Sequence, residues 1–303
     1  MKISVVITTY NGSKYIIQQL ESIKCQTQIP DEVLIFDDCS TDNTAEVIRD
    51  FIKNNKLKNW KIEKNSEKKG WKLNFIDGFK KASGDIIFPC DQDDIWHVNK
   101  IKEMSEILKE REYINVLVAN YTKFFDGISG RNNKIYINDN LISKIELNNY
   151  SIYNSRPGCV YAFKKDFFMK YKELWNGLMP HDDFLWKTAV LTNSLYLFNQ
   201  SVIEYRRHGE TTTKNRTSLK EKRESAKAEY LYFSECAKNK DIKAYLEFVK
   251  EHIEFSKFRI NALNKRNLKN LFKIFKYRKY YKTKKSFWGE LLYILNIRGV
   301  TND

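Results

Sequence analysis

The sequence has little cysteine and no paired cysteine motif. Its five cysteines are scattered along the chain, and no two of them form a CxxC arrangement. An odd, unpaired set argues against a disulfide framework and against a zinc site built from cysteine pairs. Unpaired cysteines are also typical of reduced thiols in a cytosolic compartment. We therefore expect a cytoplasmic protein with free thiols.

Long apolar runs are missing as well. Charged residues interrupt every stretch that approaches the roughly 20 apolar residues of a spanning helix. The first residues, Met1 to Ile7, lead directly into a strand pattern and lack the apolar core and cleavage site of a secretory signal. We expect neither a membrane-spanning segment nor secretion.

Acidic residues are absent between Asn261 and Lys285, a stretch that holds ten lysines and arginines. The whole chain has 53 Lys+Arg and 38 Asp+Glu, a net charge of +15, which favours anionic partners. Aromatic residues alternate with these bases at helical spacing, as in a helix that lies on an anionic membrane surface. The alternative is a helical subdomain whose aromatics pack on the rest of the chain or on a second subunit in a homo-oligomer. A nucleic-acid partner is disfavoured, because no recognition motif for one is present.

Strand patterns alternate with helix patterns through the first two thirds of the chain, which predicts an α/β fold with a mainly parallel sheet covered on both faces. We expect short strands at the end of this region, over 194–200 and 202–205, and a Gly- and Asn-rich loop or hairpin over 126–140. Beyond Thr211 the pattern is helical and contains no proline. We therefore divide the chain into a domain of residues 1–213 and a basic, aromatic-rich helical extension of residues 214–303.

Three carboxylates crowd the end of one predicted strand. The apolar run from Asp85 to Cys90 is followed by Asp91-Gln92-Asp93-Asp94. In open α/β sheets, ligands bind at the carboxyl ends of the strands. Packed anions repel one another unless a cation or protons share the site, and hard divalent cations take oxygen ligands of this kind. The run therefore predicts a metal ion that holds a phosphate. The alternative is a solvated acidic turn before the helix that we expect from about Val98.

Similar polar groups follow other predicted elements: Thr8-Thr9-Tyr10-Asn11 ends the first strand, Asp37-Asp38 ends the second, and His181-Asp182-Asp183 comes later. With the run at 91–94, these motifs resemble the family 2 glycosyltransferases, which have the GT-A fold. The segment Asp91 to Trp96 is particularly similar to the rhamnosyltransferase-like branch. The resemblance covers roughly residues 2–212. It implies a nucleotide-binding half over 1–95 and an acceptor half over 96–213.

The resemblance implies a set of residues that bind a nucleoside diphosphate sugar donor. In the family's D-x-D motif the last carboxylate, here Asp93, binds Mn²⁺ or Mg²⁺, and a late histidine, here His208, approaches the metal or the diphosphate. Lone histidines are also often structural. The other donor-binding residues implied are Thr8, Tyr10, Asn11, Asp37, Asp38, Gly70, Asn74, Asp91 and Arg206.

The resemblance also implies a catalytic base and residues for the acceptor. Asp182 occupies the position of the base, which takes a proton from the acceptor hydroxyl so that the anomeric centre is inverted. Asp183, Trp96 and Gly158 are implied on the acceptor side. The alternative for the two acids is that they cap a helix over 184–191, and the alternative for Trp96 is core packing.

These features together predict a cytoplasmic, metal-dependent, inverting glycosyltransferase, either a hexosyl- or a rhamnosyltransferase, that acts on a glycan or lipid-linked acceptor. The resemblance alone supplies the setting, bacterial surface polysaccharide biosynthesis at the inner face of the membrane. A glycoside hydrolase would use paired carboxylates but would leave the nucleotide-type strand ends unexplained. A protein that binds nucleotide sugars or polyanions through its basic tail without turnover stays open as an alternative.

Overall fold

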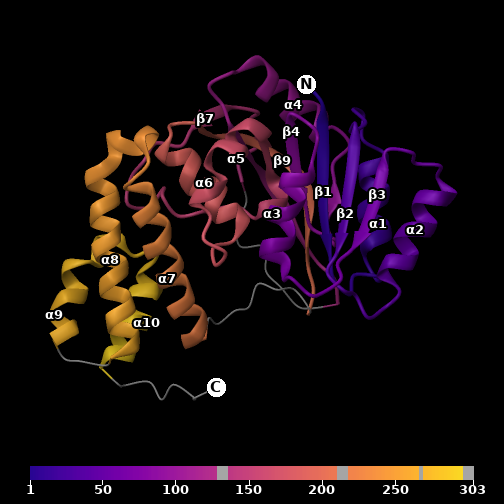
Figure 1. Ribbon diagram of the computed structural model, residues 1–303. Helices are drawn as coiled ribbons and strands as arrows, with labels where there is room; N and C mark the ends of the chain where they lie inside the picture. Colours follow the sequence, from indigo (N-terminus) through magenta and orange to yellow (C-terminus); the bar gives the residue numbers. More distant parts are fainter. Residues whose placement is uncertain (128–135, 210–217, 266–268, 296–303) are drawn as a thin grey trace. The chain divides into compact units, whose positions relative to one another are not determined.

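The computed structural model describes residues 1–127, 136–209, 218–265 and 269–295 (Figure 1). The chain divides into two compact units, each assembled from separate segments. The first unit holds residues 1–145, 155–171 and 193–212, and the second holds residues 146–154, 172–192 and 213–303. We describe each unit by itself.

Four parallel strands form one side of the sheet in the first unit. Their order is β3-β2-β1-β4, and every residue of the central strand β1 is buried, as its unbroken apolar run requires. Thr9 pairs with Asp37 and Ile7 pairs with Cys90, so the loops that follow β1, β2 and β4 leave the same edge of the sheet. The strands are β1 (Ile3–Thr9), β2 (Glu32–Asp37), β3 (Trp60–Lys64) and β4 (Ile86–Cys90), and the helices that connect or follow them are α1 (Ile16–Lys24), α2 (Thr44–Asn54), α3 (Trp71–Lys81) and α4 (Lys100–Glu110).

The sheet continues through strands of both directions. In the described residues its order is β3-β2-β1-β4-β8-β6-β9-β5, and β7 also pairs with β9. The parallel ladders are long, whereas each antiparallel ladder spans two or three residues, so the predicted mainly parallel sheet is confirmed. The added elements are β5 (Ile95–Trp96), β6 (Val116–Phe125), β7 (Ile142–Lys144), η1 (Gly158–Val160), β8 (Tyr161–Lys164), α5 (Lys165–Tyr171) and β9 (Leu195–Arg207).

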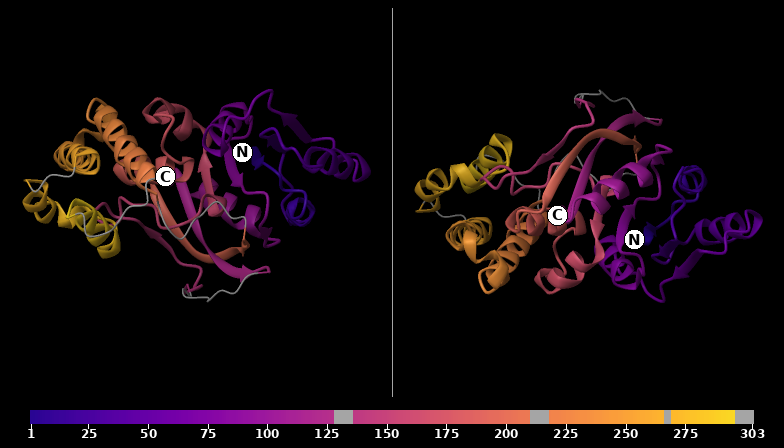
Figure 2. Two further views of the ribbon diagram at one scale, coloured as in Figure 1. Left: turned by 90° about the horizontal axis from the view of Figure 1, so that it is seen from below. Right: turned by 90° about the horizontal axis from the view of Figure 1, so that it is seen from above.

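The long strands β6 and β9 run side by side, as Figure 2 shows. The two short strands that the sequence predicts over 194–205 are in fact the single strand β9. The pairing register with β6 shifts on both sides of Asn120, which pairs with Ser201. This irregularity accommodates Ser201, the polar residue between the two predicted strands, within β9. Residues 128–135 of the predicted loop lie outside the described residues.

The second unit is helical, which confirms the helices predicted at the end of the chain. Ser218 starts α7 with a capping box in which its hydroxyl accepts from the backbone N–H of Glu221. Two aromatics of the basic stretch, Tyr280 and Tyr281, pack with Phe255 and Phe287 in a core. The elements are η2 (Lys172–Leu174), α6 (His181–Leu191), α7 (Leu219–Cys236), η3 (Lys240–Tyr245), α8 (Leu246–Asn264), α9 (Lys269–Lys276), η4 (Arg278–Tyr280) and α10 (Lys284–Ile294).

A nearly buried ion group joins three helices of this unit. Arg259 on α8 donates to Glu229 on α7 at 3.0 Å and to Glu290 on α10 at 2.8 Å. The hydroxyl of Tyr281 donates to the other oxygen of Glu290 at 2.8 Å. One guanidinium therefore holds two carboxylates that are both almost withdrawn from water.

The second unit also contains residues 146–154 and 172–192, which the sequence analysis placed in the acceptor half. Trp186 on α6 donates its ring N–H to the carbonyl of Ser151, and Thr188 on the same helix hydrogen-bonds Tyr232 on α7. The predicted boundary at residue 213 falls in 210–217, outside the described residues, and it stays a prediction. No helix of the described ranges combines the length and the apolarity that crossing a membrane requires.

Candidate functional site

The loop after β1 is fastened to the loop after β2. Asn11, with a positive φ of 48°, accepts from the backbone N–H of Thr41 at 2.9 Å, and its own N–H donates to Ser40 Oγ at 2.9 Å. The ring of Tyr10 is 39% exposed, and the ammonium of Lys68 lies 3.6 Å from its centroid. Thr8 is buried on β1. Of the three residues predicted here, Tyr10 and Asn11 are exposed.

The two acids at the end of β2 differ in their partners. Asp37 is fully buried and accepts from Thr9 Oγ1 at 3.1 Å and from the backbone N–H of Ser40 at 3.0 Å. Asp38 accepts from the backbone N–H groups of Lys69 at 2.7 Å and Gly70 at 2.8 Å. Asp37 therefore has a folding role in this structure, Asp38 shapes the turn before α3, and donor contact from either acid stays a prediction.

Gly70 and Asn74 support the same turn. Gly70 has a φ of 80°, in the left-handed region, and it is the residue that precedes α3. Asn74 is buried, accepts from the side chain of Asn65 at 2.9 Å and donates to the carbonyl of Phe36 at 3.0 Å. Asn65 in turn donates to Asp38 at 3.0 Å, so the ends of β2 and β3 share one polar network.

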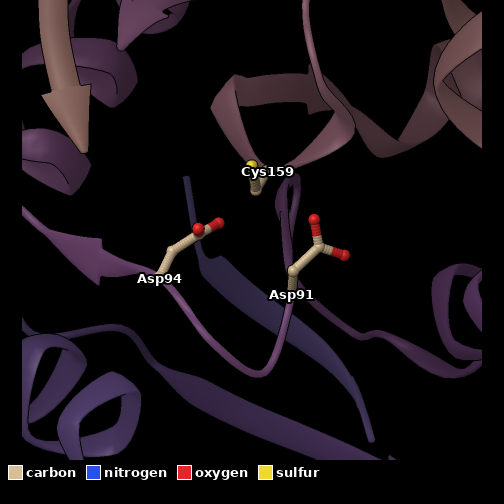
Figure 3. A group of neighbouring side chains, drawn as sticks. All are labelled: Asp91, Asp94 and Cys159. Atoms are coloured by element: carbon tan, nitrogen blue, oxygen red, sulfur yellow. The ribbon is translucent and has the colours of Figure 1, made fainter. Parts of the chain in front are cut away.

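The acidic loop between β4 and β5 brings its carboxylates toward one another. Asp91 and Asp94 lie at its two ends, with Cys159 from η1 beside them (Figure 3). One ligand atom from each of these three residues lies within 4.8 Å of the others. Burial raises the pKa of the Cys159 thiol well above its usual range, so the sulfur is a protonated and poor ligand for a hard cation.

Asp93 points to a different partner, the imidazole of His208. Asp93 Oδ2 lies 2.9 Å from His208 Nε2, although the two residues are 115 positions apart. Both side chains are largely buried, and the ring of Tyr15 packs against His208 with centroids 4.5 Å apart. The structure thus brings together the two residues that the resemblance implies as metal ligands. Carboxylate oxygens and one imidazole form a donor set that fits Mn²⁺ or Mg²⁺.

Arg206 holds this acidic loop through hydrogen bonds from its side chain and its backbone. Its Nε donates to the carbonyl of Asp93 at 2.7 Å, and its backbone N–H donates to Asp94 Oδ1 at 3.0 Å. The guanidinium is stacked between the rings of Tyr15, at 4.7 Å, and Phe124, at 4.5 Å, and the residue is 5% exposed. The structure gives Arg206 a positioning role, and its contact with a diphosphate stays a prediction.

Gln92 is a site residue that the sequence analysis did not identify. Its side-chain oxygen accepts from the backbone N–H of Tyr10 at 2.9 Å, and its amide donates to the carbonyl of Tyr10 at 3.1 Å. A Cβ on Gly12 would lie 2.2 Å from the same oxygen, so a larger residue at this position would displace the Gln92 amide. Gln92 therefore clamps the loop after β1 to the acidic loop.

Lys100 is a second residue that the sequence analysis missed. It is fully buried on α4, its ammonium donates to the carbonyl of Cys159 at 2.6 Å, and it lies 3.4 Å from the centroid of the Trp96 ring. Burial lowers the pKa of Lys100 to about 8, while Asp94 and Asp91 act in the opposite direction. The Lys100 ammonium therefore offsets part of the negative charge of the acidic loop.

Trp96 and Gly158 are both buried in the first unit. At 2% exposure, Trp96 offers no surface to an acceptor sugar, and it packs against Phe88 with ring centroids 6.1 Å apart. This corrects the implied acceptor role in favour of core packing. Gly158 begins η1, and its role in admitting substrate stays a prediction.

The implied base lies in the second unit, in the first turn of α6. The helix begins at His181, three residues earlier than the sequence predicts, because Pro180 precedes it with extended backbone. Asp182 accepts from the side-chain amide of Asn154 at 2.8 Å and from the backbone N–H of Asp183 at 2.9 Å. Burial, followed by the charge of Asp183, raises the pKa of Asp182 to about 6.

Asp183 has a different environment. It forms an ion pair of 2.5 Å with Lys187, whose side chain is 1% exposed. The two adjacent acids therefore differ in environment. Asp183 neutralises a buried lysine, whereas the pKa of Asp182 suits proton transfer near neutral pH. Acceptor contact from Asp183 stays a prediction.

Comparison with known proteins identifies the class. The sequence profile of the family described as Glycosyl transferase family 2 matches residues 4–173. This chain belongs to glycosyltransferase family 2 and has the GT-A fold, as the resemblance implied.

Three proteins are similar to this chain in sequence or in fold. The dTDP-rhamnosyl transferase RfbG of Shigella flexneri is 29% identical over 215 residues, which cover 67% of this chain and 71% of RfbG. The poly(ribitol-phosphate) beta-N-acetylglucosaminyltransferase TarS of Staphylococcus aureus is 31% identical over 133 residues, covering 43% of this chain and 22% of TarS. The structure of TarS 1-349 with UDP-GlcNAc has a TM-score of 0.67 at 21% identity, over 98% of this chain and 80% of that one.

The third is the mannosyltransferase PcManGT of Pyrobaculum calidifontis, solved with GDP-Man and Mn²⁺. Its TM-score is 0.54 at 15% identity, over 97% of this chain and 85% of that one. At these identities both structural matches are evidence for the fold alone.

Proposed function

We propose that this chain is an inverting, metal-dependent glycosyltransferase that moves a sugar from a nucleoside diphosphate donor to a glycan or lipid-linked acceptor. The observation that carries the proposal is the 2.9 Å approach of Asp93 to His208 at the sheet edge where β1, β2 and β4 end. A binding site at this edge is expected for the open α/β architecture.

Asp93 and His208 would hold the Mn²⁺ or Mg²⁺ ion. When bound, the ion supplies positive charge to a diphosphate leaving group. The protein contributes the shape of this site: Arg206 holds the main chain of Asp93, and Gln92 ties the same loop to Tyr10. The exposed ring of Tyr10 suits stacking with the donor's base.

Asp182 would act as general base and accept the proton of the attacking acceptor hydroxyl. A carboxylate whose pKa is raised to about 6 is ionised at neutral pH and is a stronger base than an ordinary aspartate. Attack on the face opposite the diphosphate then inverts the anomeric centre.

For the donor, we propose a dTDP-linked rhamnose or a UDP-linked hexose. RfbG, named for dTDP-rhamnose, is similar over two thirds of this chain, and TarS is solved with UDP-GlcNAc. The proposed setting is the assembly of bacterial surface polysaccharide at the cytoplasmic face of the membrane. The names of the relatives support it, since RfbG and TarS are named for transfer reactions on sugars and on a ribitol-phosphate polymer.

Calorimetric titration with UDP, dTDP and GDP, with and without Mn²⁺, tests donor binding and metal dependence together. We expect one diphosphate to bind tightly only with the metal. The Asp93→Ala variant should weaken this binding by about 100-fold or more, because even outer partners of a metal site contribute 10- to 100-fold to affinity.

Asp50, an exposed acid on α2, provides the matched control, and Asp50→Ala should bind as the wild type does. If the folded wild-type protein binds none of the three diphosphates, the non-catalytic alternative replaces our proposal. Equal binding by Asp93→Ala would show that the metal site lies elsewhere.

A second role, attachment to an anionic membrane surface, is supported by one surface of the second unit. Phe272 and Phe275 on α9 are 82% and 52% exposed, and Trp288 on α10 is 52% exposed. No acid occurs from 269 to 289, and the same segment contains exposed bases: Lys273, Lys276, Arg278, Lys279, Lys284 and Lys285. Basic residues with exposed aromatics bind the headgroup region of anionic bilayers.

Flotation with phosphatidylglycerol and phosphatidylcholine vesicles tests this role. We expect binding to the anionic vesicles at low salt only, and its loss in a Phe272→Ser/Trp288→Ser double variant. Tyr113→Ser, which removes an exposed aromatic of the first unit, should bind normally. Failure of the wild type to float with anionic vesicles would rule the membrane role out.

A further inference from the structure

Two consecutive residues of the second unit are fastened to the segment between η4 and α10. The hydroxyl of Tyr153 donates to the carbonyl of Tyr280, and the ammonium of Lys282 donates to the carbonyl of Asn154 at 2.5 Å. The segments are 127 and 128 residues apart in sequence. Residues 153 and 154 are therefore held by the end of the chain in addition to the local bond from the backbone N–H of Tyr153 to the carbonyl of Tyr150.

The side chain of Asn154 carries this constraint to Asp182. Its amide donates to Asp182 Oδ2 at 2.8 Å, while Asp182 Oδ1 accepts from the backbone N–H of Asp183. An amide donor stabilises the ionised carboxylate and fixes the rotation of the carboxyl group. The direction of that amide depends on where the main chain of Asn154 is held.

The charges around Asp182 come from three elements. Asp183 follows it on α6 and raises the pKa of Asp182, but Asp183 is itself paired with Lys187 at 2.5 Å. Burial lowers the pKa of Lys282, between η4 and α10. The carboxylates of Asp183 and Asp182 and, more weakly, Glu229 on α7 act in the opposite direction. Lys282 is thus placed to act on the base in two ways, by its charge and by its hydrogen bond to Asn154.

We propose that Asn154 and Lys282 are positioning residues for the general base, through the chain of contacts Lys282 to Asn154 to Asp182. Lys282 fixes the Asn154 main chain, and Asn154 orients the Asp182 carboxylate and keeps it ionised. The segment between η4 and α10 thereby takes part in catalysis through Lys282, without touching the substrate itself. This inference rests on the proposed role of Asp182 as the base.

The direct test is the titration of the Asp182 carboxyl by NMR in full-length protein labelled with ¹³C at aspartate carboxyls, with the signal assigned by its loss in Asp182→Asn. Asn154→Ala should raise the Asp182 pKa by about one unit, since a hydrogen bond to a charged group is worth roughly 1.5 kcal/mol or more. Lys282→Met should shift it in the same direction, and Lys282→Arg should restore it. Asn261→Ala and Lys250→Met, which change exposed residues of α8, should leave it unchanged.

Kinetics provide the second readout. Asn154→Ala should lower kcat by about 10- to 100-fold, the cost of a misplaced catalytic group, while KM for the donor stays the same. An Asp182 titration that moves in neither Asn154→Ala nor Lys282→Met overturns the proposal. A shift in Lys282→Met without one in Asn154→Ala also overturns it, because the lysine would then act by charge alone.

The test of the positioning role and the test of the proposed function can fail independently of each other. The NMR titration needs neither donor nor acceptor, so it reports on the contacts even if the enzyme's substrates differ from those proposed. If Asp182→Asn keeps full turnover, the base assignment fails and the catalytic part of this inference fails with it. If Asp182→Asn is inactive and the titration does not respond to Asn154→Ala, only the positioning role fails.

Discussion

Replacing Asp182 by Asn is expected to reduce kcat by about 10²- to 10⁴-fold, the usual contribution of a general base, while donor affinity stays unchanged. The amide cannot accept the proton of the acceptor hydroxyl, yet it is isosteric with the carboxylate. Transfer measured under single-turnover conditions, beside calorimetry with the nucleoside diphosphate, separates the two effects. The matched control is Asp166→Asn, which changes an exposed acid in the first turn of α5.

The pH dependence of the transfer rate tests the same assignment of Asp182 as the base. Because burial raises the pKa of Asp182 to about 6, the base is ionised above that pH and protonated below it. The rate of the wild type should therefore fall about tenfold per pH unit below pH 6, and this acidic limb should be missing from the residual activity of Asp182→Asn. Near-normal turnover in Asp182→Asn would contradict the assignment.

Replacing Arg259 by Met is expected to lower the free energy of unfolding by about 3–5 kcal/mol, because it leaves charged partners buried and unpaired. Arg259 holds Glu229 at 3.0 Å and Glu290 at 2.8 Å, and these two side chains are 10% and 3% exposed. Urea unfolding followed by circular dichroism measures the loss.

Lys257→Met is the comparison for Arg259→Met, since Lys257 lies on the same helix and pairs with Glu254 at 3.0 Å on the surface. An exposed, solvent-screened pair of this kind contributes little to stability, so this variant should unfold at about the urea concentration of the wild type. Equal loss in the two variants would show that the buried ion group does not hold the helices together.

The strand ends of the first unit were predictable because the signal is local. Apolar runs such as β1 and β4 give strands by their composition, and in an open sheet the residues after them must meet at one edge. The resemblance then supplied what spacing cannot supply, the pairing of Asp93 with His208 across 115 residues. Their approach needs the sheet to place β9 near the acidic loop.

The residues that were missed, and the contacts that Arg206 makes, all depend on tertiary packing. Lys100 has the pattern of an ordinary surface lysine of an amphipathic helix, yet it is buried and donates to the carbonyl of Cys159. Arg206 reads as a phosphate ligand, yet two aromatic rings and the acidic loop use its guanidinium. Gln92 has no sequence signal at all, because its function is to bridge two loops. Each outcome is decided by neighbours that lie far away in the sequence.

The second unit is discontinuous, and this has a consequence for how the protein is made. Helix α6 carries Asp182, and its residues from Phe184 to Leu191 are all buried. Its partners on α7, and Lys282 beyond η4, leave the ribosome only later, since domains form from the N-terminal end during synthesis. Until then α6 lacks its contact with α7, and Asn154 lacks its bond from Lys282. A nascent chain can complete the sheet edge of the first unit early, but the surroundings of Asp182 are complete only when the last helices have been translated.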